Sequence, residues 1–455
     1  MRVRRILTLA LAAGLTATAL VVLRELRGAT GYAAKLLCSG VFVAGRAPES
    51  LLAEDLGWFS WLLSRVDRAE RTATSDWHGF ARSTAVYRDG LGCALAVGAS
   101  PGELRAQGFD PGPAPDRSAI PWPAGDLVPQ DGARRAELDA AVVSAFGEPD
   151  PQIHRRTRAV IVLHAGRLVA ERYAPGFDAA TPLLGWSMTK SVIATLIGIQ
   201  VLRGRLDPAA GAGVASWRGD ERAAITLEQL LRMTSGLAFA ERNGALGDSV
   251  AMLFRSRSAS AYAARSQLAH APGTFWSYSS GTSNLLAAIL RASLAGESAV
   301  YHRFPREALF DRIGMRSAVL ETDAAGDFVG SSFCYATARD WARFGLLYAQ
   351  DGVWQGERLL PDGWVARLRR PTPQAPRGSY GAHWWLNAGE MGAAEERPYP
   401  SLPTDLFYAS GYEGQFVVVI PSHDLVVVRL GQSEPEHAFD LGEFLGGILA
   451  AFRPE

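Results

Sequence analysis

The sequence predicts a mixed α+β fold in which strands from both chain ends form one antiparallel sheet flanked by helices. Two pairs of apolar, β-branched runs, each joined by a short turn, indicate hairpins. The first pair spans 159–164 and 167–173, and the second spans 416–420 and 425–430. Helical patterns dominate the stretch between them, which favours a helical subdomain. Helices are expected at 136–146, 186–206, 226–233, 285–294, 338–349 and 439–452.

Composition excludes several classes of function. The 455 residues carry 46 Lys plus Arg and 46 Asp plus Glu, so the formal net charge is zero. A chain without basic excess is not expected to bind nucleic acid. The three cysteines are too few for a disulfide scaffold and show no zinc-ligand spacing, so a structural metal is not expected. No organic cofactor is expected either.

The N-terminus resembles a targeting segment. Arg2, Arg4 and Arg5 precede an uncharged run over residues 6–23. A cationic start before an apolar run predicts a signal peptide or signal anchor within residues 1–30. The body is then expected to be periplasmic or otherwise extracytoplasmic, tethered to the inner membrane by residues 6–23. In such an oxidising compartment Cys38 and Cys93 can pair.

Prolines divide the rest of the chain. They cluster between residues 111 and 129, which is typical of a linker. This predicts an accessory region at 31–130, which includes the linker, and a main domain at 131–455.

Lysine usage singles out one motif. Lysine occurs only at Lys35 and Lys190, so arginine supplies every other basic side chain. A buried lysine can lose its proton, whereas a guanidinium effectively cannot. Ser187 and Lys190 are spaced i, i+3 at the start of a long apolar helix, which places both on one helix face. The pattern therefore predicts a nucleophilic serine beside a base, with free N–H groups of the first turn facing an oxyanion.

Two loop segments supply candidate partners. Tyr278 lies in a turn-rich segment before a helix, and a nearby lysine ammonium can lower its pKa and allow proton transfer. Ser410, Gly411 and Tyr412 lead into a C-terminal strand. There the small residues let a substrate approach the backbone, and the Tyr412 N–H can complete an oxyanion hole.

A second serine motif is rejected. The segment Gly98-Ala-Ser100-Pro101-Gly102 matches the G-x-S-x-G nucleophile elbow. That elbow uses the backbone N–H after the serine, which Pro101 lacks.

Taken in order, these segments resemble the serine β-lactamase and penicillin-binding protein superfamily. The similarity extends over about residues 135–455, includes 230–237 and 335–345, and is greatest to the branch of class C β-lactamases, D-aminopeptidases, family VIII esterases and 6-aminohexanoate-dimer hydrolases. It implies a β-lactamase/transpeptidase-like fold and a serine hydrolase domain at 131–455. The implied roles are nucleophile for Ser187, proton transfer for Lys190 and Tyr278, and an oxyanion hole from the N–H groups of Ser187 and Tyr412. Which of Lys190 and Tyr278 is the base stays open.

Two departures from this branch bear on the substrate. The chain has Tyr278-Ser-Ser280 where β-lactamases have Tyr-x-Asn, and Ala409-Ser410-Gly411 where they have Lys-Thr-Gly. The cation that pairs with a β-lactam or peptide carboxylate is absent from that strand. We therefore expect a small ester or amide substrate held by Ser280, Ser410 and Gly411. The alternatives are a β-lactamase or D,D-peptidase, and a slowly acylated sensor or structural envelope protein.

Overall fold

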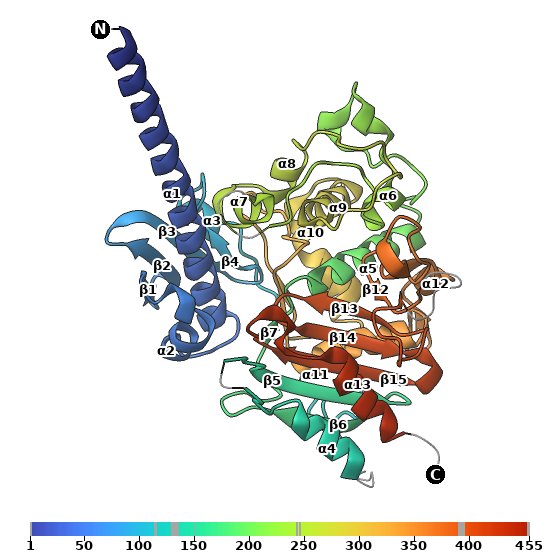
Figure 1. The fold of residues 1–455 in the computed structure, drawn as a ribbon. Coiled ribbons are helices and arrows are strands. Elements are labelled where there is room, and N and C mark those ends of the chain that lie inside the picture. Colours follow the sequence, from blue (N-terminus) through green and yellow to red (C-terminus); the bar gives the residue numbers. More distant parts are fainter. Residues whose placement is uncertain are drawn as a thin grey trace.

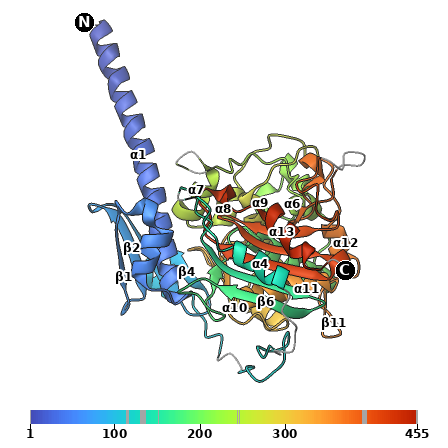
Figure 2. The same ribbon diagram turned by 60° about the horizontal axis from the view of Figure 1, so that its bottom comes forward.

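The computed structural model describes residues 2–112, 116–128, 136–150, 152–242, 244, 247–389 and 396–452, with backbone only for 2–17 and 436. A larger body of sheet and helices lies beside a small N-terminal module (Figure 1). Helix α1 (Arg2–Phe42) runs along that module and projects beyond it in both ribbon views (Figure 2).

The larger body is built on a six-stranded antiparallel sheet. Its order is β12, β13, β14, β15, β5, β6. Strand β15 pairs with β5, with Val428 opposite Ile161, so both ends of this body form one sheet as predicted. The strands are β5 (Thr157–His164), β6 (Arg167–Tyr173), β12 (Trp385–Leu386), β13 (Phe407–Gly411), β14 (Gln415–Ile420) and β15 (Leu425–Gly431).

Both faces of this sheet are covered. Successive side chains of a strand point to opposite faces, so Ile161 and Val162 enter different cores. The larger core lies under α5 (Met188–Leu202) and α11 (Ala338–Ala349), and the smaller one under α4 (Ala136–Ser144) and α13 (Leu441–Ala450). Burial on both faces explains the continuous apolar runs of β5 and β15.

The remaining elements between the two hairpins form the helical subdomain and two small sheets. The helices are α6 (Leu227–Leu231), α7 (Asp248–Arg255), α8 (Ala259–Ala263), α9 (Ser280–Ser293), α10 (Ser298–Pro305) and α12 (Trp364–Leu368). The small sheets are β7 (Leu183–Leu184) with β9 (Cys334–Ala336) and β8 (Val319–Leu320), and β10 (Val353–Trp354) with β11 (Glu357–Arg358).

The N-terminal module packs the second half of α1 against a four-stranded antiparallel sheet. Cys38 of α1 and Cys93 of β4 form a disulfide across this contact, with Cα atoms 6.1 Å apart. Cys334 is a free, buried cysteine. The other elements are β1 (Leu63–Asp67), β2 (Thr72–Trp77), β3 (Phe80–Arg88), β4 (Gly92–Leu95), α2 (Pro48–Ser50) and α3 (Pro101–Arg105).

Two sequence predictions fall partly outside the described residues. The proline-rich linker includes 113–115, and the boundary near 130 lies within 129–135, which are not described. Most of the apolar run 6–23 belongs to the part of α1 whose side chains are not described. Among the residues that the structure describes, no helix is long and apolar enough to cross a membrane. Both the domain division and the anchor stay predictions.

A buried ion pair joins the N-terminal module to the larger body. The Lys35 ammonium on α1 contacts the Glu321 carboxylate, and both side chains are almost fully buried. Glu321 also accepts hydrogen bonds from Ser39 Oγ at 2.9 Å and from the Cys93 N–H at 2.6 Å. Burial lowers the pKa of Lys35, and Glu321 opposes that shift. Lys35, one of the two lysines of the chain, thus joins the N-terminal module to the larger body.

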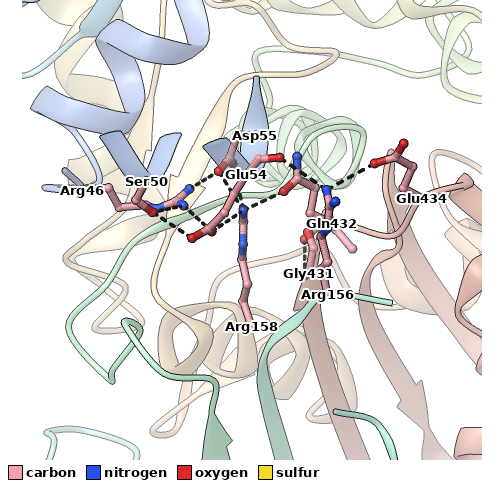
Figure 3. A network of polar contacts seen from close by, with 10 residues as sticks. Arg46, Ser50, Glu54, Asp55, Arg156, Arg158, Gly431, Gln432 and Glu434 are labelled. Atoms are coloured by element: carbon pink, nitrogen blue, oxygen red, sulfur yellow. Dashed lines mark hydrogen bonds and ion pairs between the residues drawn. The ribbon is translucent and has the colours of Figure 1, made fainter. Parts of the chain in front are cut away.

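A second polar network also joins the N-terminal module to the larger body (Figure 3). Arg158 of β5 donates to both oxygens of Asp55, at 2.9 and 2.8 Å. Arg46 donates to the same carboxylate at 2.6 Å, and Gln432 accepts from Arg158 at 2.8 Å. Paired guanidinium and carboxylate groups of this geometry fix orientation as well as contact.

We expect Glu321→Gln to lower the free energy of unfolding by about 3 to 5 kcal/mol, because it leaves a buried ammonium without its counter-charge. Urea unfolding measures this effect. The double variant Lys35→Met/Glu321→Gln should recover most of the loss. Asp89→Asn, which breaks an exposed pair with Arg71, should cost less than about 1 kcal/mol. Equal losses in Glu321→Gln and Asp89→Asn would contradict this role.

Candidate active site

The site begins at the N-terminus of α5. Ser187 occupies the N-cap position, and residues 188–200 of the helix are all buried. A helix that is buried on every side packs inside a core, so its first turn has little freedom to move. Trp186, immediately before the serine, has φ of +46°, a left-handed conformation that is costly for a bulky residue. The surrounding packing therefore holds the turn that contains Trp186 and Ser187 in a strained conformation.

Lys190 lies one turn along α5 and is buried. Its Nζ donates to Ser187 Oγ at 2.9 Å, to Ser280 Oγ at 3.1 Å and to the Ser331 carbonyl at 3.0 Å. Three acceptors match the three N–H bonds of an ammonium. Burial nevertheless lowers the pKa of Lys190 to about 8, with Glu241 opposing the shift. A lysine with this pKa can exchange a proton with Ser187 near neutral pH.

Glu241 extends this hydrogen-bond chain to the surface, and sequence reasoning missed it. Its carboxylate accepts from Ser280 Oγ at 2.6 Å and from the Ser280 N–H, at the start of α9, at 2.7 Å. Ser280 thus lies between Lys190 and an exposed carboxylate. No motif surrounds Glu241 in the sequence. The only available signal was a lone acid a few residues after the 230–237 segment.

Tyr278 lies against Lys190. The Lys190 ammonium is 4.8 Å from the centre of the Tyr278 ring. Tyr278 also stacks on Trp385 at 5.5 Å and meets Tyr380 edge to face at 6.0 Å. Together with Trp276 these rings form an aromatic wall beside Lys190.

The end of β13 lies directly against the turn that contains Gly185 and Ser187. A Cβ built on Gly411 would lie 2.2 Å from the Gly185 carbonyl oxygen, so only glycine permits this approach. The Tyr412 ring meets Trp186 edge to face at 5.6 Å. The structure thus brings the segment that contains Ser410, Gly411 and Tyr412 to the turn that contains Ser187. This is the neighbourhood that a shared oxyanion hole requires.

The N-terminal module supports the same turn from behind, which the sequence did not indicate. Tyr32 of α1 stacks on Trp186 with ring centres 6.1 Å apart. Trp186 hydrogen-bonds Glu413, and burial raises the pKa of Glu413 to about 7 while Arg158 opposes that rise. The strained residue before Ser187 therefore packs against the N-terminal module and contacts a residue coupled to the network of Figure 3.

An antiparallel sheet, a buried helix that begins at a serine, and a lysine one turn later define a class of serine hydrolases. The chain belongs to the β-lactamase family, whose family profile matches residues 139–451. It is a serine hydrolase of that family.

Individual relatives agree with this assignment. A 6-aminohexanoate-dimer hydrolase of Paenarthrobacter ureafaciens is 25% identical over 303 residues, 60% of this chain and 72% of that protein. The crystal structure of a family VIII carboxylesterase matches with a TM-score of 0.52 and 15% identity, over 71% of this chain and 98% of that one. A penicillin-binding protein homologue from Caulobacter crescentus matches with a TM-score of 0.52 and 16% identity over the same shares. These structural matches establish the mixed α/β fold with its antiparallel sheets.

The pKa of Lys190 gives a pH dependence with a definite sign. If neutral Lys190 is the base, kcat/KM rises with pH through about 8, because the ammonium must lose its proton before it can accept one from Ser187. Glu241→Gln removes a charge that raises this pKa, so the rise should move to lower pH. The profile is measured with p-nitrophenyl butyrate, and Glu221→Gln, an exposed acid elsewhere, serves as the control.

The opposite sign would assign the base to the other candidate. A kcat/KM that falls as pH rises through about 8 would show that the Lys190 ammonium is the active form. Tyr278 would then be the group that accepts the proton from Ser187.

Proposed function

We propose that this protein is an exported serine hydrolase that cleaves small esters or amides through an acyl-enzyme on Ser187. The observation that carries the proposal is the 2.9 Å contact between Ser187 Oγ and the buried Lys190 Nζ. A hydroxyl is a poor nucleophile until a base removes its proton, and Lys190 is both placed and tuned for that task.

The reaction proceeds in two halves. Neutral Lys190 takes the hydroxyl proton while Ser187 Oγ bonds to the substrate carbonyl carbon, and the N–H groups of Ser187 and Tyr412 stabilise the resulting oxyanion. The oxyanion collapses, the bond to the leaving group breaks, and the leaving group takes a proton through Lys190 or Tyr278. Water then attacks the acyl carbon and gives its proton to the same base, which releases the acid and restores Ser187.

Three features of the site favour an uncharged substrate with an apolar acyl group. Ser410 stands where a cation would neutralise a substrate carboxylate, and it offers only a hydrogen bond. Glu241 adds a negative charge beside Ser280, which disfavours an anion. The aromatic wall around Tyr278 suits an apolar chain. Two relatives, a family VIII carboxylesterase and a 6-aminohexanoate-dimer hydrolase, have names that fit the same choice.

Export and tethering form the second part of the proposal. The cationic start and uncharged run of residues 6–23 lie on the part of α1 that projects from the body (Figures 1 and 2). The Cys38–Cys93 disulfide is of a kind that persists in oxidising compartments. We place the hydrolase outside the cytoplasm, held at the inner membrane by residues 6–23.

Ser187→Ala should abolish steady release of p-nitrophenol from p-nitrophenyl butyrate. Loss of the nucleophile removes the acyl-enzyme route, so kcat/KM should fall at least about 10³-fold. The full chain is assayed in detergent for both the initial burst and the steady rate. Ser100→Ala is the matched control, because Ser100 caps α3 and should leave the rate unchanged.

Other outcomes separate the alternatives. An initial burst of p-nitrophenol without steady release would identify a sensor that is acylated but releases its acyl group slowly. Turnover of a chromogenic cephalosporin but not of the ester would favour a β-lactamase. A Ser187→Ala variant as active as the wild type would overturn the proposal.

A further inference from the structure

We propose that the N-terminal module docks onto an anionic lipid surface through a membrane collar beside α1. This inference rests on the proposed tethering by residues 6–23. The collar consists of five exposed apolar side chains and four arginines, namely Trp58, Trp61, Leu63, Trp77 and Phe80 with Arg24, Arg27, Arg82 and Arg255.

The apolar members stand out by their exposure. Trp58 is 75% exposed, Phe80 is 67%, and Trp61, Trp77 and Leu63 lie between 41% and 47%. The chain has 12 tryptophans, and within the described residues only Trp58, Trp61 and Trp77 are classed as exposed. Monomeric proteins rarely gather large apolar side chains on one exposed surface without a partner for them.

Local contacts hold these side chains at one end of the module. The Trp77 and Phe80 rings are 6.3 Å apart at the tip of the β2–β3 hairpin. Leu63 at the start of β1 pairs with Asp76, directly beside Trp77. The Trp61 indole N–H donates to the Trp58 carbonyl at 3.0 Å in the segment that leads into β1.

The tip of the β2–β3 hairpin is hydrogen-bonded to α1 close to the predicted membrane segment. Thr30 Oγ1 donates to the Ala81 carbonyl at 2.7 Å and lies 2.9 Å from Ser83 Oγ. Residue 30 lies about 10 Å along the helix from residue 23. Residues 6–23 span about 27 Å as a helix, close to the hydrocarbon thickness of roughly 30 Å. The tip therefore falls near the headgroup layer, where tryptophan is enriched.

The arginines line a groove beside the same stretch of α1. The groove has a volume of about 880 Å³ and lies between α1, the β3–β4 edge and α7. Arg24 and Arg27 lie on one face of α1, Arg82 on β3 and Arg255 at the end of α7. Burial lowers the pKa of Arg255, and the nearby Arg24 charge lowers it further, while Tyr262 and Glu25 oppose that shift.

Two carboxylates offset part of this charge. Asp248 accepts from the Tyr262 hydroxyl at 2.6 Å and from the Ala240 N–H at 2.7 Å. Glu25 lies on α1 between the two helix arginines. Four guanidinium groups against these two carboxylates leave a positive groove, which complements a phospholipid phosphate. Exposed aromatics beside a basic groove, both next to an apolar helix, fit a lipid bilayer better than a protein partner.

The test uses the full chain in nanodiscs, with tryptophan fluorescence quenched by lipids brominated near the headgroup. Residues 1–57 contain no tryptophan, so anchor insertion alone produces no quenching. We expect quenching on the order of a quarter of the emission, the share of three tryptophans in 12. The variant Trp58→Ser/Trp61→Ser/Trp77→Ser should lose this quenching and keep its esterase activity.

The arginine groove is tested with the same signal. Phosphatidylglycerol in the disc should increase the docked fraction relative to phosphatidylcholine alone. Arg27→Gln/Arg82→Gln should reduce the ratio of docked to undocked protein about fivefold per arginine. Arg205→Gln/Arg218→Gln, exposed on the larger body, is the matched control and should change nothing.

Each failure has its own reading. If the wild-type chain stays in the discs but is quenched no more than the triple variant, the proposed lipid docking of the collar is wrong. Tethering by residues 6–23 would still hold in that case. A chain that never enters the discs overturns both. A lipid-independent emission shift that grows with protein concentration would assign the surface to a second copy of the chain and overturn the lipid proposal. None of these outcomes alters the Ser187 assay in detergent.

Discussion

Burial of the Lys190 ammonium is the constraint on which the catalytic half of the structure depends. An ammonium removed from water needs an acceptor for each N–H, and Ser187, Ser280 and the Ser331 carbonyl supply all three. These acceptors come from the start of α5, the start of α9 and the loop before β9, so one side chain fixes three segments. The same burial lowers the pKa of Lys190 to about 8. In the proposed mechanism, the side chain that holds these segments together therefore also acts as the base.

The N-terminal module completes this arrangement. It is joined to the larger body by the Lys35–Glu321 ion pair and by the Arg158–Asp55 pair. Tyr32 of α1 also stacks on Trp186, the strained residue before Ser187. The module therefore supports the active-site turn and, in our proposal, also sets that site at the membrane.

The sequence was sufficient to predict the sheet and the placement of Ser187 beside Lys190, because both arrangements follow from local patterns. The β5–β6 and β14–β15 hairpins follow from apolar runs around short turns, and Ser187 with Lys190 from helical spacing. Glu241, Tyr32 and Glu413 were out of reach because each meets the site only through tertiary contacts. The pairing of Lys35 with Glu321 was equally hidden, since 286 residues separate the partners. The scarcity of lysine singled out both buried ammonium groups, but only the serine three residues before Lys190 suggested a role for one of them.

The most direct test of the central claim is intact and peptide mass spectrometry of the full chain quenched during turnover of p-nitrophenyl butyrate. The account predicts a mass increase of one butyryl group, located on the peptide that contains Ser187 and absent from Ser187→Ala. Steady hydrolysis with the butyryl group on another residue, or with Ser187 unmodified under conditions that trap acyl-enzymes, would contradict it.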